Sequence, residues 1–246
     1  MKNIFRTLLV ALLIVPCALL MVACKKDEKP QEATISSSYN ETNIQNNINN
    51  LAEEKGGVFI KVKVTAAGEE TSVGTICAYG RYGDLYYFEI NGVQTIFDMS
   101  SDDYMIKYYR NTGDDKWTKD GFNYISPAVR ERCQKQLNEY FETINVQFSV
   151  YAQFKNFKMT KTSAQIAGRD CDKFVLDLSK YASSFGSELG AALGEQTFYI
   201  DKETGACLKF EVSVTSQHGS ASATFECLEF KTGYTITVPT KDEINK

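Results

Sequence analysis

The spacing of apolar residues changes several times along the chain, and each change predicts a new element. Between residues 40 and 55, Ile44, Ile48 and Leu51 recur every three or four residues, which predicts an amphipathic helix that ends at Gly56-Gly57. From residue 58 to 66 apolar and polar residues alternate, which predicts a strand with one buried face. Similar strand-like runs lie at 71–80, 85–90, 93–99, 103–110, 162–168, 171–178, 196–200, 206–214, 221–230 and 234–239.

Asn91-Gly92 joins two of these runs and predicts a tight β-hairpin, because both central positions of such a turn need positive φ. The turn fixes the pairing of the two strands and places their aromatic residues on one face. The predicted pairs are Ile90 with Val93, Phe88 with Thr95, and Tyr86 with Phe97.

Two helices are predicted in the second half of the chain. Ser126-Pro127 supplies an N-cap and a first-turn proline, and apolar residues then recur every three or four positions, so we expect a long helix to about residue 155. The small-residue segment 179–194 predicts a second, looser helix.

The last third predicts a meander of antiparallel strands with a turn at His218-Gly219. This turn places Phe210 opposite Cys227. In that register Cys207 and Cys227 face opposite sides of the sheet, so we expect no disulfide between them.

The N-terminus has the layout of a secretory signal. Lys2 and Arg6 precede an apolar run that Pro16 interrupts, and this run is too short for a typical membrane-spanning helix. The sequence Leu20-Met21-Val22-Ala23-Cys24 resembles the lipobox of bacterial lipoproteins, with leucine replaced by Met21 three positions before the cysteine. We therefore expect a signal peptide at 1–23, acylation of Cys24 with diacylglycerol and a chain such as palmitate, and a flexible tether at 24–40.

Charge and length limit the classes of function. Removing residues 1–23 takes away two basic and no acidic residues, so the net charge changes from −4 to −6. An acidic chain is not attracted to nucleic acid or to anionic lipid by its charge. We expect one domain at 41–240, followed by a C-terminal tail at 241–246.

The sequence offers little catalytic chemistry. The only histidine, His218, lies in a predicted turn, no CxxC pair occurs, and an odd number of cysteines follows Cys24, so no metal or cofactor site is predicted. An enzyme would depend on paired carboxylates, Asp102-Asp103 or Asp114-Asp115, but solvated turns explain both pairs better. We therefore predict that the protein is not an enzyme and has no catalytic residues.

The segments "QIAGRDCDKFVLDL" and "QTFYIDKETGACLKFEV" resemble the second half of the LolA/LolB-like lipoprotein-carrier superfamily, which includes the mycobacterial lipoproteins LppX and LprG. The resemblance covers about residues 40–238 and is strongest after Thr162. It implies an α+β fold: a strongly curved antiparallel sheet, an unclosed barrel, with helices across its concave face. It also implies an apolar cavity for acyl chains and a strand arginine that holds the lid helices, here Arg81 or Arg110.

The resemblance implies six residues that line this cavity; the alternative is that they pack as ordinary core. They are Tyr86, Phe88, Ile90, Phe97, Ile106 and Tyr108. The expected function is non-catalytic binding of a lipid or other apolar ligand in the cell envelope. The protein would be anchored to the extracytoplasmic face of the cell membrane, or to an outer membrane. The alternative is an envelope scaffold or sensory interaction module with a filled core and no ligand.

Overall fold

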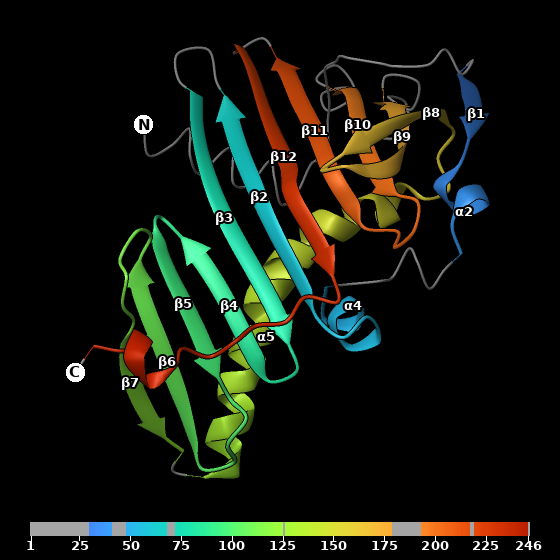
Figure 1. Cartoon of the computed structure of the whole chain (residues 1–246). Coiled ribbons are helices and arrows are strands. Elements are labelled where there is room, and N and C mark those ends of the chain that lie inside the picture. The colour runs from blue at the N-terminus through green and yellow to red at the C-terminus, as the bar shows by residue number, and fades with distance from the viewer. Residues whose placement is uncertain are drawn as a thin grey trace. The chain divides into compact units, whose positions relative to one another are not determined.

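The computed structural model describes residues 30–40, 48–67, 72–124, 126–178, 193–216 and 219–245 (Figure 1). The predicted signal peptide and Cys24 lie outside these ranges, as does most of the helix expected at 179–194. No helix in the described part of the chain is long and apolar enough to cross a membrane.

The described strands form one antiparallel sheet that does not close, which confirms the predicted α+β class. Its strand order is β1-β8-β9-β10-β11-β12-β2-β3-β4-β5-β6-β7. The strands are β1 (Gln31–Ala33), β2 (Val58–Ala67), β3 (Ser72–Tyr82), β4 (Leu85–Ile90), β5 (Val93–Asp98), β6 (Tyr104–Asn111), β7 (Thr118–Asn123), β8 (Met159–Ile166), β9 (Arg169–Asp177), β10 (Leu193–Asp201), β11 (Cys207–Ser216) and β12 (Gly219–Thr232). The helices are α2 (Ile35–Ser38), α4 (Ile48–Glu54), α5 (Pro127–Ser149), and the 3-10 helices η1 (Val150–Phe154) and η3 (Lys241–Glu243).

The chain divides into two compact units. Unit 1 comprises Met1–Gln45, Lys63–Gly74 and Ser149–Glu226; unit 2 comprises Asn46–Val62, Thr75–Phe148 and Cys227–Lys246. The long helix begins at Pro127 as predicted, and α5 with η1 extends to Phe154.

Unit 1 is built around phenylalanine side chains on one face of β9, β10 and β11. Phe198 lies opposite both Phe174 and Phe210, and the Phe198 and Phe210 rings stack with centroids 5.3 Å apart. Phe154 of η1 covers this face, with its ring centroid 5.9 Å from that of Phe198. Alternation along three neighbouring strands therefore produces one continuous aromatic core.

The N-terminal segment of unit 1 corrects the predicted tether, which included residues 31–39. β1 pairs with the edge strand β8, and Ile35 of α2 is fully buried. Thr34 caps α2, and the Tyr39 hydroxyl bonds to Asp172 and to the Ile200 carbonyl. The sequence pattern did not predict this strand, because the hydrogen bonds that join it to the sheet edge come from the backbone and need no apolar alternation.

The register of β11 and β12 differs from the prediction by two residues. Ser216 pairs with Gly219, and Phe210 lies opposite Phe225 instead of Cys227; His218 of the predicted turn lies outside the described residues. A two-residue shift keeps every side chain on its predicted face, since side chains alternate with period two. Neither Cys207 nor Cys227 takes part in a disulfide, which agrees with the expected absence of a bond between them.

Unit 2 contains the predicted hairpin. Ile90 pairs with Val93 and Tyr86 with Phe97, and the turn residues Asn91 and Gly92 have φ of 52° and 77°. β7 was not predicted, because its sequence, TKDGFN, lacks apolar alternation. It adds to the sheet by pairing with β6.

The C-terminal segment of unit 2 also differs from the prediction. Residues 234–239 form no strand; instead Ile236 packs on the sheet against Ile96, Tyr108 and Trp117. The segment predicted as a tail includes η3, and the Trp117 amide donates to the Glu243 carbonyl at 2.7 Å. Alternation of period two predicts an extended chain, but it cannot distinguish a strand from an extended segment lying on a sheet face.

Candidate functional site

The register of unit 2 places the six predicted lining residues on two different faces of its strands. Cross-strand pairing keeps Tyr86, Phe88, Ile90 and Phe97 on one face. β6 pairs Phe97 with Lys107 and Ile96 with Tyr108, so Ile106 and Tyr108 point to the opposite face. The six residues therefore do not share one surface.

We call the face that carries Tyr86 and Phe88 the helix-side face, because α5 lies against it (Figure 1). The Tyr86 hydroxyl donates to Asn138 of α5 at 3.1 Å, and Arg130 of α5 donates to the Met99 carbonyl at 3.1 Å. Burial raises the pKa of Tyr86, so its hydroxyl stays neutral and acts as a donor. The N-terminal half of α5 is thus fixed to the β4 and β5 end of this face.

The aromatic residues under the helix are closely packed. Tyr86 has no exposed surface and Phe88 is 7 % exposed. The Phe88 ring makes edge-on contacts with Tyr79 and Phe97, with centroids 5.7 and 5.9 Å apart. A side chain without exposed surface cannot line a void, so at Tyr86 the helix-side face is filled by side chains.

The other end of the helix-side face is open. Ile90 is 38 %, Val93 40 % and Tyr109 36 % exposed. Ile90 lies directly opposite Val93 across the hairpin, and Thr95, two residues from Val93, pairs with Tyr109. These three residues form the hairpin-end patch, an apolar surface continuous with the buried aromatic cluster of Phe88.

The helix-side face also carries the arginine that the resemblance left undecided. Arg81 is 9 % exposed, lies over the Tyr86 ring and donates to Glu53 of α4 at 3.0 Å. Arg110 lies on the opposite face, where it bonds to Gln94 and lies 4.3 Å from the Trp117 ring centroid. Arg81 is therefore the arginine that joins a strand of unit 2 to a helix.

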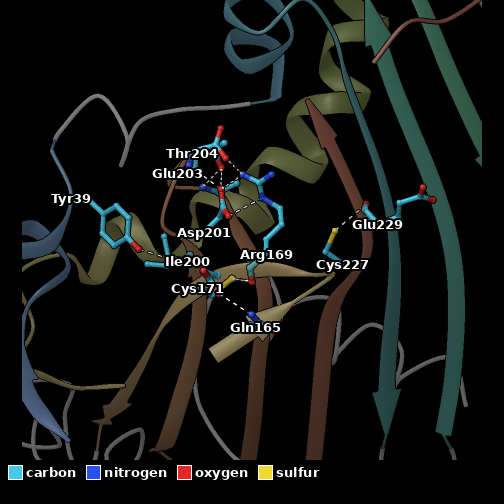
Figure 2. A network of polar contacts seen from close by, with 12 residues as sticks. Tyr39, Gln165, Arg169, Cys171, Ile200, Asp201, Glu203, Thr204, Cys227 and Glu229 are labelled. Carbon is cyan, nitrogen blue, oxygen red and sulfur yellow. Dashed lines mark hydrogen bonds and ion pairs between the residues drawn. The ribbon is translucent and has the colours of Figure 1, made fainter. Parts of the chain in front are cut away.

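Unit 1 holds a separate polar network at the turn between β10 and β11 (Figure 2). Arg169 donates to both oxygens of Asp201, at 2.8 and 2.9 Å, and to Glu203 at 2.8 Å. Asp201 is 1 % exposed and also accepts bonds from the amide and hydroxyl of Thr204. Because its charge and hydrogen bonds are satisfied locally, this network serves to hold the turn.

Cys171 and Cys207 are buried, and the aspartates considered as paired acids lie on exposed turns and loops. Burial raises the pKa of the Cys171 and Cys207 thiols to about 12, so both stay protonated at neutral pH. Asp102 is exposed beside Arg130, and Asp114 accepts bonds from Asn111 in a turn. The described part of the chain contains no group of His, Cys, Asp and Glu that could hold a metal ion.

Sequence reasoning found four of the relevant residues and missed others. The Asn91-Gly92 turn was sufficient to place Tyr86, Phe88, Ile90 and Phe97 on one face. Tyr109 was missed, because residues 99–103 between β5 and β6 carry no turn signal that fixes the next register. The predicted lipidation site, Cys24, lies outside the described residues.

No family model and no curated protein matches the chain. Among solved structures, the chain is similar to one from the MucA/MucB complex of Pseudomonas aeruginosa, with 10% identity and a TM-score of 0.30, over 80% of this chain and 58% of that one. It is also similar to the lipoprotein LppX of Mycobacterium tuberculosis, with 14% identity and a TM-score of 0.28, over 78% of this chain and 94% of that one.

A third similar structure is a putative outer membrane lipoprotein-sorting protein domain from Vibrio parahaemolyticus. Its identity is 7% and its TM-score 0.22, over 79% of this chain and 95% of that one. The chain spans only about 58% of the MucA/MucB chain that it matches. The fold class rests on the strand order and register of this chain itself.

Proposed function

We propose that this protein is a bacterial lipoprotein anchored through Cys24 to the extracytoplasmic face of the cell membrane, or to an outer membrane. Its folded part binds a lipid or other apolar ligand without catalysis. In this proposal the fold is of the LolA-like kind, and the lipobox at Leu20–Cys24 supplies the anchor.

The observation that carries the binding function is the hairpin-end patch. Ile90, Val93 and Tyr109 are each more than a third exposed, although they continue a buried aromatic cluster. Adjacent exposed apolar side chains offer a surface on which an apolar molecule can be bound. The Arg81–Glu53 pair supports the same function, since it holds α4 beside strand β3 of this unit.

A second candidate is the scaffold or sensory module with a filled core. The packing of Tyr86 favours it, because this predicted lining residue has no exposed surface and bonds to α5. The two candidates differ in whether an apolar molecule binds to the hairpin-end patch. A ligand-binding protein takes up apolar molecules there, whereas a scaffold does not.

The experiment measures binding of diphenylhexatriene to the full-length protein in phosphatidylcholine vesicles. Trp117 is the only tryptophan of the chain, so the difference in energy transfer from it between variants in the same vesicles reports probe bound to unit 2. We expect Ile90→Glu to fold, because this position is 38 % exposed, and to lose most of the transfer. Val238→Glu is the matched control: Val238 is 39 % exposed, and we expect transfer as in the unchanged protein.

A third variant, Phe88→Glu, tests the packing itself. Phe88 is 7 % exposed, so a carboxylate there is buried without a partner and we expect the protein to unfold, as followed by circular dichroism.

If the folded, unchanged protein gives no transfer above that of Ile90→Glu, ligand binding at the patch is wrong and the scaffold remains.

A further inference from the structure

We propose that Lys107 recognises the anionic head group of a single-chain amphiphile, a long-chain fatty-acid carboxylate, whose tail lies on the hairpin-end patch. This inference rests on the proposed function and names the ligand class of the same site.

The position of Lys107 on the helix-side face is the first element of this inference. Lys107 is the direct cross-strand partner of Phe97, and its side chain is half-buried. Its Nζ lies 4.8 Å from the centroid of the Tyr109 ring, which belongs to the hairpin-end patch. A cation therefore lies at the border between the buried aromatic cluster and the exposed apolar patch.

The second element is that Lys107 lacks an ion-pair partner. Lys107 forms no ion pair with any carboxylate among the described residues, and the carboxylate of its cross-strand neighbour Asp120 accepts the Gly121 amide. Half-buried lysines of unit 1 differ: Lys161 contacts Asp172 at 2.8 Å and Lys209 contacts Glu211 at 3.1 Å. An ammonium that loses part of its hydration without an anionic partner is available to a carboxylate from outside.

The third element is the shape of the apolar surface beside this cation. Among the four residues, Lys107 lies in the row of side chains farthest from the hairpin turn. Tyr109 lies in the next row, and Val93 and Ile90 lie together in the row nearest the turn. One acyl chain lying along these rows covers all three exposed side chains while its carboxylate meets Nζ. The patch has too few exposed residues to cover two parallel chains, which favours a single-chain ligand.

The test is competition against diphenylhexatriene in the vesicle assay, with three ligands that share one dodecyl chain. They are dodecanoate, dodecanol and dodecyltrimethylammonium, compared at a pH at which dodecanoate is ionised. We expect dodecanoate to compete best. Lys107→Met, which keeps the apolar stem, should lower its affinity by about fivefold to tenfold and leave dodecanol unchanged.

Lys119→Met is the matched control. Lys119 is exposed and pairs with Tyr108, so it lies on the opposite face of the same strands, and its substitution should change neither ligand. Equal competition by dodecanoate and dodecanol, or no effect of Lys107→Met on a folded protein, would overturn the role of Lys107 and leave apolar binding standing. Absence of diphenylhexatriene binding would instead reject the proposed function.

Discussion

At the scale of single residues, burial decides which side chains are chemically available. Cys207 has no exposed surface, and its thiol donates to the Lys209 carbonyl at 3.1 Å. Lys107 and Tyr109, by contrast, keep contact with water beside an apolar core. Ligand binding is therefore expected at the exposed rim of the helix-side face of unit 2. The buried thiols contribute to packing.

The Cys207 thiol predicts how stability responds to alkali. Burial raises its pKa from the ordinary thiol value of about 9 to about 12, so above pH 9 the unfolded chain loses this proton while the folded chain keeps it. Its contribution to the free energy of unfolding is complete below pH 9 and falls by up to about 1.4 kcal/mol per pH unit between pH 9 and 12. Urea unfolding between pH 9 and 12 measures this effect: the free energy of unfolding should fall less steeply with pH for Cys207→Ala than for the unchanged protein. An equal fall in both proteins would contradict the raised pKa of Cys207.

At the scale of elements, short segments at the sheet edge have a large structural effect. β1 has only three residues, but it helps to dock the N-terminal segment on unit 1, because Ile35 follows it into the core of this unit. Residues 25–29 separate Cys24 from the first described residue, Pro30, and an extended chain of this length spans at most about 20 Å. If Cys24 is acylated, the β1 edge of unit 1 therefore stays close to the membrane surface.

This docking of the N-terminal segment can be tested at Ile35. We expect Ile35→Ala to weaken it by about 2–4 kcal/mol, because it deletes a fully buried side chain. Hydrogen exchange of the amides in 31–38 should accelerate accordingly. Ser36 is the next residue and is exposed, so it provides the control. Ser36→Ala should leave these amides nearly as protected from exchange as in the unchanged protein. Equal exchange in both variants would mean that Ile35 does not hold the segment.

At the scale of the whole molecule, the proposed anchor at Cys24 would decide where the protein acts. An acyl-anchored protein binds its ligand beside the membrane surface, where single-chain amphiphiles concentrate. Two acyl chains hold a protein durably, whereas one holds it only marginally. Attachment at Cys24 is therefore as important to the proposed function as the hairpin-end patch.

The anchor is tested by Cys24→Ser. We expect this variant to take up no labelled fatty acid and to remain uncleaved or become soluble, because the thiol proposed to be acylated is missing. Membrane fractionation and metabolic labelling measure both effects, and Cys77→Ser is the control that should still be labelled. A Cys24→Ser protein that is processed and membrane-bound would contradict the lipobox interpretation.

The sequence by itself determined the local elements and one face of the candidate site. Alternation of period two predicted ten of the strands, Ser126-Pro127 predicted the start of α5, and Asn91-Gly92 fixed the hairpin register. These signals are local, because a turn of defined backbone geometry or a repeated burial pattern restricts the residue types at positions close together in the sequence. Tyr86, Phe88, Ile90 and Phe97 could be placed together for this reason.

Only the tertiary structure decided the pairing of β1 and β7 and the register of β6. Sheet edges are joined by backbone hydrogen bonds, which any sequence can supply, so Gln31–Ala33 and Thr118–Asn123 carry no distinctive pattern. Between β5 and β6 the connection does not fix a register, and one residue of slip exchanges the two faces. That register placed Lys107 and Tyr109 beside the hairpin and moved Tyr108 to the opposite face, because side-chain direction depends on partners distant in sequence.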